Sequence, residues 1–576
     1  MSDTRPVWGL DRTGPTWGAR MFAPSSGQDH LGLGSVSSDR ILPLLSPGIN
    51  VLTIHPRYWS FYAFVLDEFW LRDLPRNRAA FRDFYRPREA IFAMVCNLCD
   101  AEEHATLGRG IVGSRKVASL TKQQQFDPGY DYIKEALGGY SLYYSSTMEA
   151  TGAIVTPTPS NGFVFDAPTP HGRAIADAYR RAISTTAMWR DYLGGNLGEP
   201  IARDVLIEFA RRGCLCQLAN ASEYDLPLLQ DLFVHAGSPE ESAARRGTFR
   251  LFLDVSPMLQ SEGITQDIFR QLIYFRLHEG EVYQPRTDLV GVARRWRLFQ
   301  AREYFSFAFN RLFGWLVRTG QRESDDGLVN VPMGHLWSWI DDALNSNAFG
   351  SGQLGTFDAA TRASEFANAL SLQVDLDPGV DDPWPRHETL DEHALYSGNP
   401  TRSDTPETVV AMIALLLLIH RRIGSQGRLA DIRADARLVT EGTTTRIGMA
   451  RFFTELNRQL MAGATLSTLA RWIIHDYIIV QHERVANAKL PDDTFRLRRI
   501  GDSIRFSAQP APADFNDSRY DALSASVHEL GLVSSLLQPS RQLTPAGEAL
   551  LQNGDIPTGS LDDAASKFLP HHSGPL

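Results

Sequence analysis

Two closely spaced cysteine pairs offer the residue types of a metal site. Cys96 and Cys99 form a Cys-x-x-Cys pair, and Cys214 and Cys216 form a Cys-x-Cys pair. Four thiolates at such spacings can bind Zn²⁺. However, the first pair lies in "IFAMVCNLCDAEEH", which has a strongly helical pattern with both sulfurs on its apolar side, whereas metal knuckles usually place such a pair on a glycine-containing turn. We therefore expect buried free thiols, no bound metal and no cofactor.

Histidines and acids gather at two further places. His475 and His482 are seven residues apart in a helical pattern, so a shared ligand is conceivable, but histidines hydrogen-bonded in or beside the core are more common. The stretch "HETLDEH" (387–393) fits neither a zinc protease nor a calcium loop. We expect it to be a solvated acidic loop.

An arginine-rich hairpin is predicted at residues 494–506, "TFRLRRIGDSIRF". Its residues alternate with period two about a Gly-Asp pair. If Phe495, Leu497, Ile504 and Phe506 face inward, the opposite face carries arginines that could follow phosphates. The alternative is a solvated face paired with acids such as Asp492 and Asp493. The candidate nucleic-acid-binding residues are Arg496, Arg498 and Arg505, which face outward, and Arg499 beside the turn.

Motifs of common enzymes are missing from the sequence. We find no P-loop, no nucleophile elbow and no dinucleotide fingerprint. "LGRGIVGS" (107–114) is rich in glycine but has neither the lysine nor the preceding strand of a phosphate cradle. The sequence favours a non-enzymatic protein, although an active site assembled from residues remote in sequence would leave no motif.

Composition indicates a soluble, globular protein of several domains. The chain has 576 residues, 43% of them hydrophobic, and a net charge of −10, which argues against a protein coated in nucleic acid. The longest apolar run, 409–419, is about half of a membrane span and predicts a buried helix. Four cysteines and no apparent signal peptide favour the cytoplasm. Because five of the 57 basic residues are Lys, the remaining 52 are Arg, a bias that we associate with GC-rich bacterial genomes.

Most of the elements that must position these residues have the apolar periodicity of helices. Residues 55–70 are apolar on most of a helix circumference and predict a central helix, in which core packing explains Arg57 and its aromatic neighbours better than a stacking platform would. Residues 292–318 predict a long aromatic helix. The fold class is mainly α and multi-domain. The expected organisation is an extended Gly/Pro/Ser-rich segment (1–54), a helical domain with a first module (55–185), a helical body (186–370), an acidic linker or loop (371–405), a helical bundle (406–490), and the arginine hairpin with a second module (491–576).

One motif occurs twice, as "PTPHGRAIADAY" (168–179) and "LTPAGEALL" (543–551). Each copy follows a short helix, a glycine (Gly152 or Gly531) and an apolar strand. Thr169 and Thr544 can cap the next helix, with a proline in its first turn. The interval from glycine to threonine is 17 residues in one copy and 13 in the other, and the difference falls in the turn, where length changes cheaply.

This order resembles the second half of a winged-helix unit, whose bacterial members often show a Thr-Pro-x-Gly step after the wing. The resemblance covers about 45 residues at 135–180 and about 40 at 515–553 and implies two winged-helix-like α+β modules. DNA reading requires basic or amide side chains on the helix before the wing. The first copy offers serines and tyrosines there, and the second offers little beyond Arg519 and His528. These helices therefore fit protein contacts better than base contacts.

The expected function follows from these modules and the absence of catalytic motifs. We expect a non-enzymatic interaction or scaffold subunit of a bacterial multi-protein system, with antiviral defence as an analogy, whose partners are proteins or further copies of this chain. The alternative is a nucleic-acid-binding protein that uses the modules and the arginine hairpin. A membrane partner is not expected.

Overall fold

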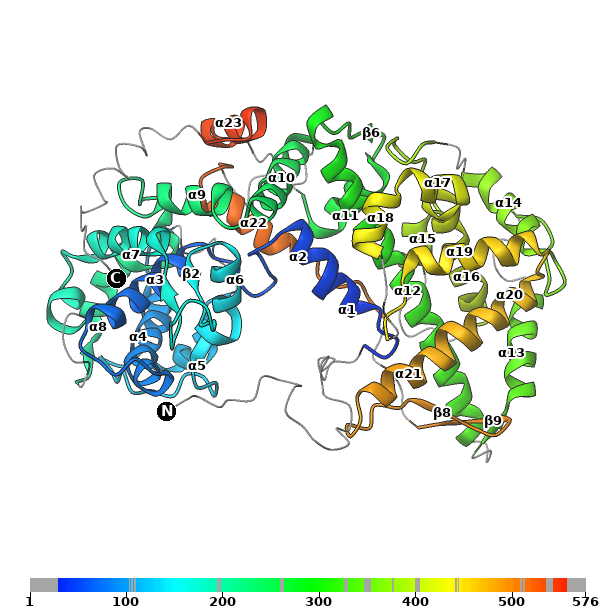
Figure 1. The fold of residues 1–576 in the computed structure, drawn as a ribbon, viewed down its shortest axis with the longest axis horizontal. Coiled ribbons are helices and arrows are strands. Elements are labelled where there is room, and N and C mark those ends of the chain that lie inside the picture. The colour runs from blue at the N-terminus through cyan, green and yellow to red at the C-terminus, as the bar shows by residue number, and fades with distance from the viewer. Residues whose placement is uncertain are drawn as a thin grey trace. The chain divides into compact units, whose positions relative to one another are not determined.

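A computed structural model shows a mainly α-helical protein that divides into two compact units. Unit 1 comprises residues 1–41 and 297–516, and unit 2 comprises residues 42–296 and 517–576. Helices predominate and the strands are short, as Figure 1 shows. The structure describes residues 29–556 apart from 103, 105, 106, 108, 109, 194–196, 198, 259–263, 326–329, 347–353, 375–377, 399–404, 441, 442, 444, 508, 509, 511, 512 and 535–541.

The core of unit 2 surrounds α3 (Arg57–Leu71), thirteen of whose fifteen residues are buried. This confirms the predicted central helix. Its main neighbour is α7 (Pro170–Ile183). The other helices of unit 2 are α2 (Leu42–Leu45), α4 (Arg78–Leu98), α5 (Ser114–Val117), α6 (Ser145–Ala150), α8 (Arg203–Gly213), α9 (Leu226–His235), α10 (Pro239–Val255), α11 (Gln266–Phe275), α22 (Tyr520–Glu529) and α23 (Pro545–Asn553). Its antiparallel strand pairs are β1 (Gln125–Phe126) with β4 (Ile201–Ala202), β2 (Ile154–Val155) with β3 (Ala167–Pro168), and β5 (Leu277–His278) with β6 (Glu281–Val282).

Unit 1 is a helical body with one small sheet. The boundary with unit 2 falls within α12 (Val290–Asp325), the predicted long aromatic helix. The apolar run 409–419 lies in α16 (Glu407–Ile419), which is buried at twelve of its thirteen residues. Among the described residues, no helix combines the length and hydropathy that crossing a bilayer requires. The remaining helices are α1 (Gly34–Val36), α13 (Met333–Asn345), α14 (Ala363–Val374), α15 (Glu392–Ser397), α17 (Gln426–Asp431), α18 (Arg433–Thr440), α19 (Met449–Met461), α20 (Leu466–Trp472) and α21 (Val480–Ala488), and the sheet has the order β7 (Val331–Pro332), β9 (Ser503–Phe506), β8 (Leu497–Ile500).

Two segments differ from their expected character. The N-terminal segment was expected to be extended to residue 54, but residues 34–45 are helical and bury Val36, Ile41 and Leu42. Apolar residues at helical spacing outweigh the glycine and serine content there. Residues 1–28 of that segment lie outside the described residues.

The acidic stretch 371–405 is not a solvated loop where the structure describes it. Trp384, Asp391 and Glu392 are fully buried. Asp391 accepts a hydrogen bond from the backbone N–H of Ala394 and so caps α15, and Glu392 pairs with Arg422 at 2.6 Å. Ion pairs inside the protein offset the desolvation cost of these buried carboxylates. Composition alone does not reveal such pairs.

The two Thr-Pro segments have the same local structure, and we call residues 145–183 the first module and residues 520–553 the second module. Gly152 and Gly531 adopt left-handed conformations (φ 76° and 71°) two residues after the last residues of α6 and α22. In the first module the hydroxyl of Thr169 donates to the Gly152 carbonyl at 2.7 Å and accepts from the N–H of Gly172 at 3.1 Å. Thr544 makes the equivalent bonds with Gly531 at 2.6 Å and with Gly547 at 3.1 Å.

The glycine of each Thr-Pro-x-Gly step is required by a close backbone approach. A Cβ atom at Gly172 would lie 2.1 Å from the Ala153 carbonyl oxygen, and one at Gly547 would lie 2.0 Å from the Leu532 carbonyl oxygen. In both modules that carbonyl belongs to the residue after the left-handed glycine and accepts the backbone N–H of the capping threonine. The recurrence of these contacts shows that the repeat extends from the sequence to its hydrogen bonds.

We predict that Gly547→Ala destabilises unit 2 by about 1 to 3 kcal/mol, because the new methyl group must displace a backbone carbonyl. The matched control is Gly334→Ala in α13, where an added Cβ meets no atom within 4 Å. There the substitution should be neutral or stabilise by up to about 1 kcal/mol. Chemical denaturation of both variants checks this, and equal effects would contradict the close approach.

Candidate functional site

Four potential metal ligands converge in unit 2. Their ligand atoms all lie within 4.8 Å of one another. The Sγ atoms of Cys99 and Cys216 are 3.5 Å apart, and the Sγ atom of Cys214 is 3.4 Å from Nδ1 of His104. Cys214 and Cys216 are buried, whereas Cys99 and His104 are partly exposed. We call Cys99, His104, Cys214 and Cys216 the Cys₃His cluster.

The ends of two helices position the cluster. α4 ends at Leu98, and Cys99 follows it with an extended backbone (ψ 125°). Three of the next four residues are acidic. Acidic side chains are unfavourable at a helix C-terminus, which accounts for the end of α4 and lets the chain turn to bring His104 back. On the other side, α8 ends at Gly213, and Cys214 precedes the 3₁₀ turn Leu215–Leu218 that carries Cys216.

A buried arginine holds the Cys214 segment in place. Nη1 of Arg57 donates to the Cys214 carbonyl at 2.7 Å, and its Nε is 3.1 Å from a carboxylate oxygen of Asp225. Arg57 is 1% exposed and Asp225 is fully buried, so core packing rather than an exposed stacking platform explains Arg57. The hydroxyl of Tyr179 donates to the Gly213 carbonyl at 2.9 Å. Two α-helices, α3 and α7, therefore support the loop that carries two of the sulfurs.

The crowding of the sulfurs makes them titrate unequally. Hydrogen bonds with the Cys214 and Cys216 thiols lower the pKa of Cys99, with a smaller contribution from His104. Hydrogen bonds with Cys214 and Cys99 raise the pKa of Cys216. A cation would remove this competition, because each sulfur could then bind it as a thiolate.

Sequence reasoning found the cysteines, which are free in the structure, although Cys99 is partly exposed rather than buried. It missed the histidine. It extended the helical pattern of "IFAMVCNLCDAEEH" past Cys99, which would have placed His104 on that helix. The overlooked signal is the Cys-x₄-His spacing of "CDAEEH" combined with its three acids. Cys96 is fully buried within α4 and lies 3.7 Å from the Cys214 sulfur, outside the cluster.

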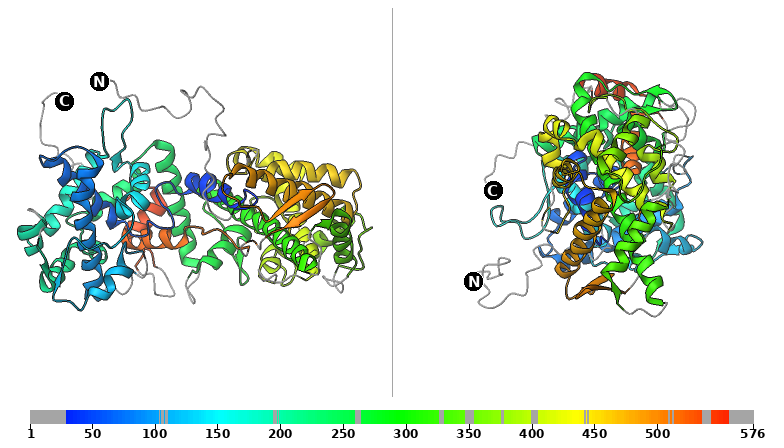
Figure 2. Two further views of the ribbon diagram at one scale, coloured as in Figure 1. Left: turned by 90° about the horizontal axis from the view of Figure 1, so that it is seen from below. Right: turned by 90° about the vertical axis from the view of Figure 1, so that its right-hand side faces the viewer.

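The arginine hairpin forms as the sequence predicted. β8 pairs with β9 around Gly501 and Asp502, and Figure 2 shows this hairpin as orange arrows. Leu497, Ile504 and Phe506 are buried, whereas Phe495 is only partly buried. Arg498, Arg499 and Arg505 are exposed, and Arg496 is half-buried.

Nearby polar groups contact the exposed arginines of the hairpin. Arg498 lies 3.2 Å from Asp493, one of the acids named from the sequence, and stacks 3.8 Å from the Phe495 ring centroid. Arg499 pairs with Glu483 at 2.7 Å. The Nε atom of Arg505 donates to the amide oxygen of Asn330 at 3.1 Å. Two of the three guanidinium groups thus have a carboxylate partner within unit 1.

His475 and His482 are held by different partners and share no ligand position. His475 contacts Asp476. Nδ1 of the fully buried His482 donates to the His30 carbonyl at 3.1 Å, and its Nε2 accepts the backbone N–H of Arg496 at 2.9 Å. Both bonds fit a neutral imidazole. Burial lowers the pKa of His482 to about 4, and burial together with His482 lowers the pKa of His30 to about 3.

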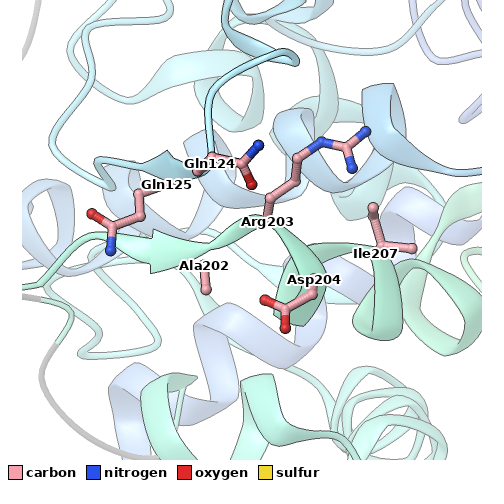
Figure 3. A pocket seen from close by; sticks show the side chains of 6 residues that line it. All are labelled: Gln124, Gln125, Ala202, Arg203, Asp204 and Ile207. Atoms are coloured by element: carbon pink, nitrogen blue, oxygen red, sulfur yellow. The ribbon is translucent and has the colours of Figure 1, made fainter.

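A surface pocket of about 550 Å³ lies at the start of α8, lined by Gln124, Gln125, Ala202, Arg203, Asp204 and Ile207. The side chains of Arg203 and Asp204 extend in opposite directions in Figure 3. The Arg203 guanidinium donates to the Thr121 carbonyl at 3.1 Å. This lining does not bring a nucleophile together with a base, so we assign no chemistry to it.

Comparisons with protein-family models, with curated proteins and with solved structures give no match for this chain. We therefore infer function from its own residues.

We predict that α21 loses stability as the pH falls from about 6.5 towards 4. In the unfolded chain His482 binds a proton near the ordinary histidine pKa of 6.5, whereas in the folded protein its pKa is about 4. Between these pH values protonation favours the unfolded state, so the free energy of unfolding falls by up to about 1.4 kcal/mol per pH unit for each such histidine.

Hydrogen exchange of the α21 amides at several pH values measures this loss. His482→Phe should lower the stability at neutral pH but also reduce its pH dependence. The control His335→Gln, at an exposed position of α13, should leave the pH dependence unchanged. An unaltered pH dependence in His482→Phe would contradict the assignment.

Proposed function

We propose that the protein is a non-enzymatic interaction subunit whose partners are other proteins or further copies of this chain. We further propose that it acts in the cytoplasm, within a bacterial multi-protein system, for which antiviral defence is an analogy. The two modules, which we interpret as winged-helix-like, supply the argument. In that interpretation, the helix before the wing would have to be accessible for DNA reading.

The helix before the wing in the second module is buried. Eight of the ten residues of α22 are buried, and the helix packs against α10 and α11. Its ring contacts include those of Tyr520 with Phe252 and Phe269. A helix enclosed by its own unit has no face for a DNA groove, which favours a protein-packing role for this module. Its wing falls largely on residues 535–541, outside the described part of the chain.

The exposed apolar tip of the first module carries the proposal. Its wing, residues 156–166, contains no Lys or Arg. Phe163 is 37% exposed and Val164 is 64% exposed, whereas Phe165 is buried. Neighbouring exposed apolar side chains favour contact with a protein over contact with phosphates.

Internal hydrogen bonds order this wing before any partner binds. The side-chain oxygen of Asn161 accepts the backbone N–H groups of Thr158 at 3.0 Å and of Phe163 at 3.1 Å. At the base of the wing, the Trp70 indole donates to the Asp166 carbonyl at 2.8 Å. Such order reduces the entropy cost of binding.

A double substitution of the wing tests the proposed function. We predict that Phe163→Ser with Val164→Ser weakens binding of the partner about tenfold or more, since two apolar anchors are removed. The control is Leu372→Ser, at an 84% exposed leucine of α14. Cross-linked complexes isolated from the native host, together with sedimentation for self-association, provide the measurement. Equal recovery of one partner by both variants, or the absence of any complex, would contradict the proposal.

A second candidate function, binding of nucleic acid, is favoured by one observation on the hairpin. Arg498 and Arg505 are directly opposite each other in the β8–β9 register, and both are exposed. Like charges at such positions are destabilising, and among the described residues Arg505 donates a hydrogen bond to the neutral amide of Asn330. An external phosphate between the strands would relieve this repulsion.

We predict for this second candidate that replacing Arg496, Arg498 and Arg505 with Ser weakens retention of duplex DNA regardless of its sequence. The salt dependence should also become shallower, by about 0.9 in the log–log slope for each phosphate that the variant no longer neutralises. Arg451→Ser is the control, because that side chain is 77% exposed on α19. Unchanged retention in the triple variant, or no retention at low salt, would exclude the hairpin.

A further inference from the structure

We propose that the Cys₃His cluster binds one Zn²⁺ ion as a structural site. This inference does not depend on the proposed partners, because it concerns a ligand set inside unit 2. Cys99, His104, Cys214 and Cys216 would supply three thiolates and one imidazole. Such a set is a common one for structural zinc.

Two of the ligand-atom separations fit a tetrahedral site. With Zn–S bonds of about 2.3 Å and Zn–N bonds of about 2.0 to 2.1 Å, tetrahedral geometry places two sulfurs about 3.8 Å apart and a sulfur about 3.5 Å from a nitrogen. The observed separations are 3.5 Å for Cys99 and Cys216 and 3.4 Å for Cys214 and His104. All four ligand atoms lie within 4.8 Å of one another, so a cation can enter this arrangement with shifts of about 1 Å or less.

The donor types select a zinc-like ion and a structural role. Thiolates and imidazole suit Zn²⁺, whereas Ca²⁺ and Mg²⁺ require oxygen ligands. Four protein ligands complete the tetrahedron and leave no position for a water or substrate. The ion would thus act as a cross-link rather than as a catalyst, in agreement with the absence of catalytic motifs from the sequence.

The surroundings also favour a cation at this point. The C-terminal ends of α4, with 21 residues, and of α8, with 11 residues, meet at the cluster. Helix C-termini carry partial negative charge, and a divalent cation between them is stabilised. The Nε2 atom of Gln217 lies 3.3 Å from the Cys216 sulfur and can donate to its thiolate.

Two cysteine pairs provide an alternative chemistry that the experiment must distinguish. The Sγ atoms of Cys99 and Cys216 are 3.5 Å apart, and those of Cys96 and Cys214 are 3.7 Å apart. Oxidation by an external oxidant could join either pair as a disulfide. In a zinc site, by contrast, Cys99 and Cys216 are both ligands and Cys96 is a bystander.

Cys96 and Cys99 form the matched pair for the test. The metal content of the full chain, purified without chelator, is measured by elemental mass spectrometry. The free thiols of the same sample are counted. We expect about one Zn²⁺ per chain in the natural protein and in Cys96→Ala, and a loss of most of it in Cys99→Ala and in His104→Ala. Zinc retained by Cys99→Ala or lost from Cys96→Ala would overturn the ligand assignment.

A second measurement covers the case in which Cys99→Ala does not fold. The natural protein is stripped of metal under reducing conditions and titrated with Co²⁺. We expect one equivalent to bind with the intense visible bands of tetrahedral thiolate coordination, and added Zn²⁺ to bleach them. Absence of these bands in folded protein, bound iron instead of zinc, or a Cys99–Cys216 disulfide in the protein as first purified would each refute the proposal.

Discussion

The buried guanidinium of Arg57 is the contact on which the arrangement of unit 2 depends. A charge this deeply enclosed must be fully partnered, because leaving a buried charge unpaired costs about 3 to 5 kcal/mol. Arg57 meets this requirement with the carboxylate of Asp225 and the carbonyl of Cys214. It thereby ties the start of α3 both to the segment before α9 and to the segment that carries the second cysteine pair. The position of the Cys₃His cluster is thus coupled to the packing of the central helix.

Other buried arginines of the chain hold main-chain carbonyls in a similar way. Arg245 donates to the carbonyls of Leu232, Phe233 and Ala236 at the end of α9. Arg519 donates to the carbonyls of Leu42, Ser46 and Ile49 around the end of α2. A planar group with five donors can satisfy several carbonyls at once, which a lysine cannot do. The excess of arginine over lysine, a bias associated with GC-rich genomes, therefore also has a structural use in this protein.

Patterns that depend on neighbouring residues were predictable from the sequence. The central helix α3, the buried helix α16, the β8–β9 hairpin and the Thr-Pro repeat follow from period, cap and turn residues. The Cys₃His cluster was not predictable in full, because its geometry depends on where α4 ends and on how two distant segments meet. The burial of Asp391 and Glu392 was hidden for the same reason, since Arg422 is remote in sequence from them. The burial of α22 likewise depends on its distant neighbours α10 and α11.

The discontinuous make-up of the two units has a consequence for synthesis on the ribosome. Unit 2 needs α22 from the far end of the chain to fill the space beside α10 and α11, and it needs Arg519 to hold the end of α2. Most of its residues emerge before residues 297–516 of unit 1 have been translated. Until residue 519 and its helix leave the exit tunnel, the apolar faces of α10 and α11 lack their cover. The nascent chain must therefore avoid aggregation while about two hundred further codons are translated. Chaperones act during this period.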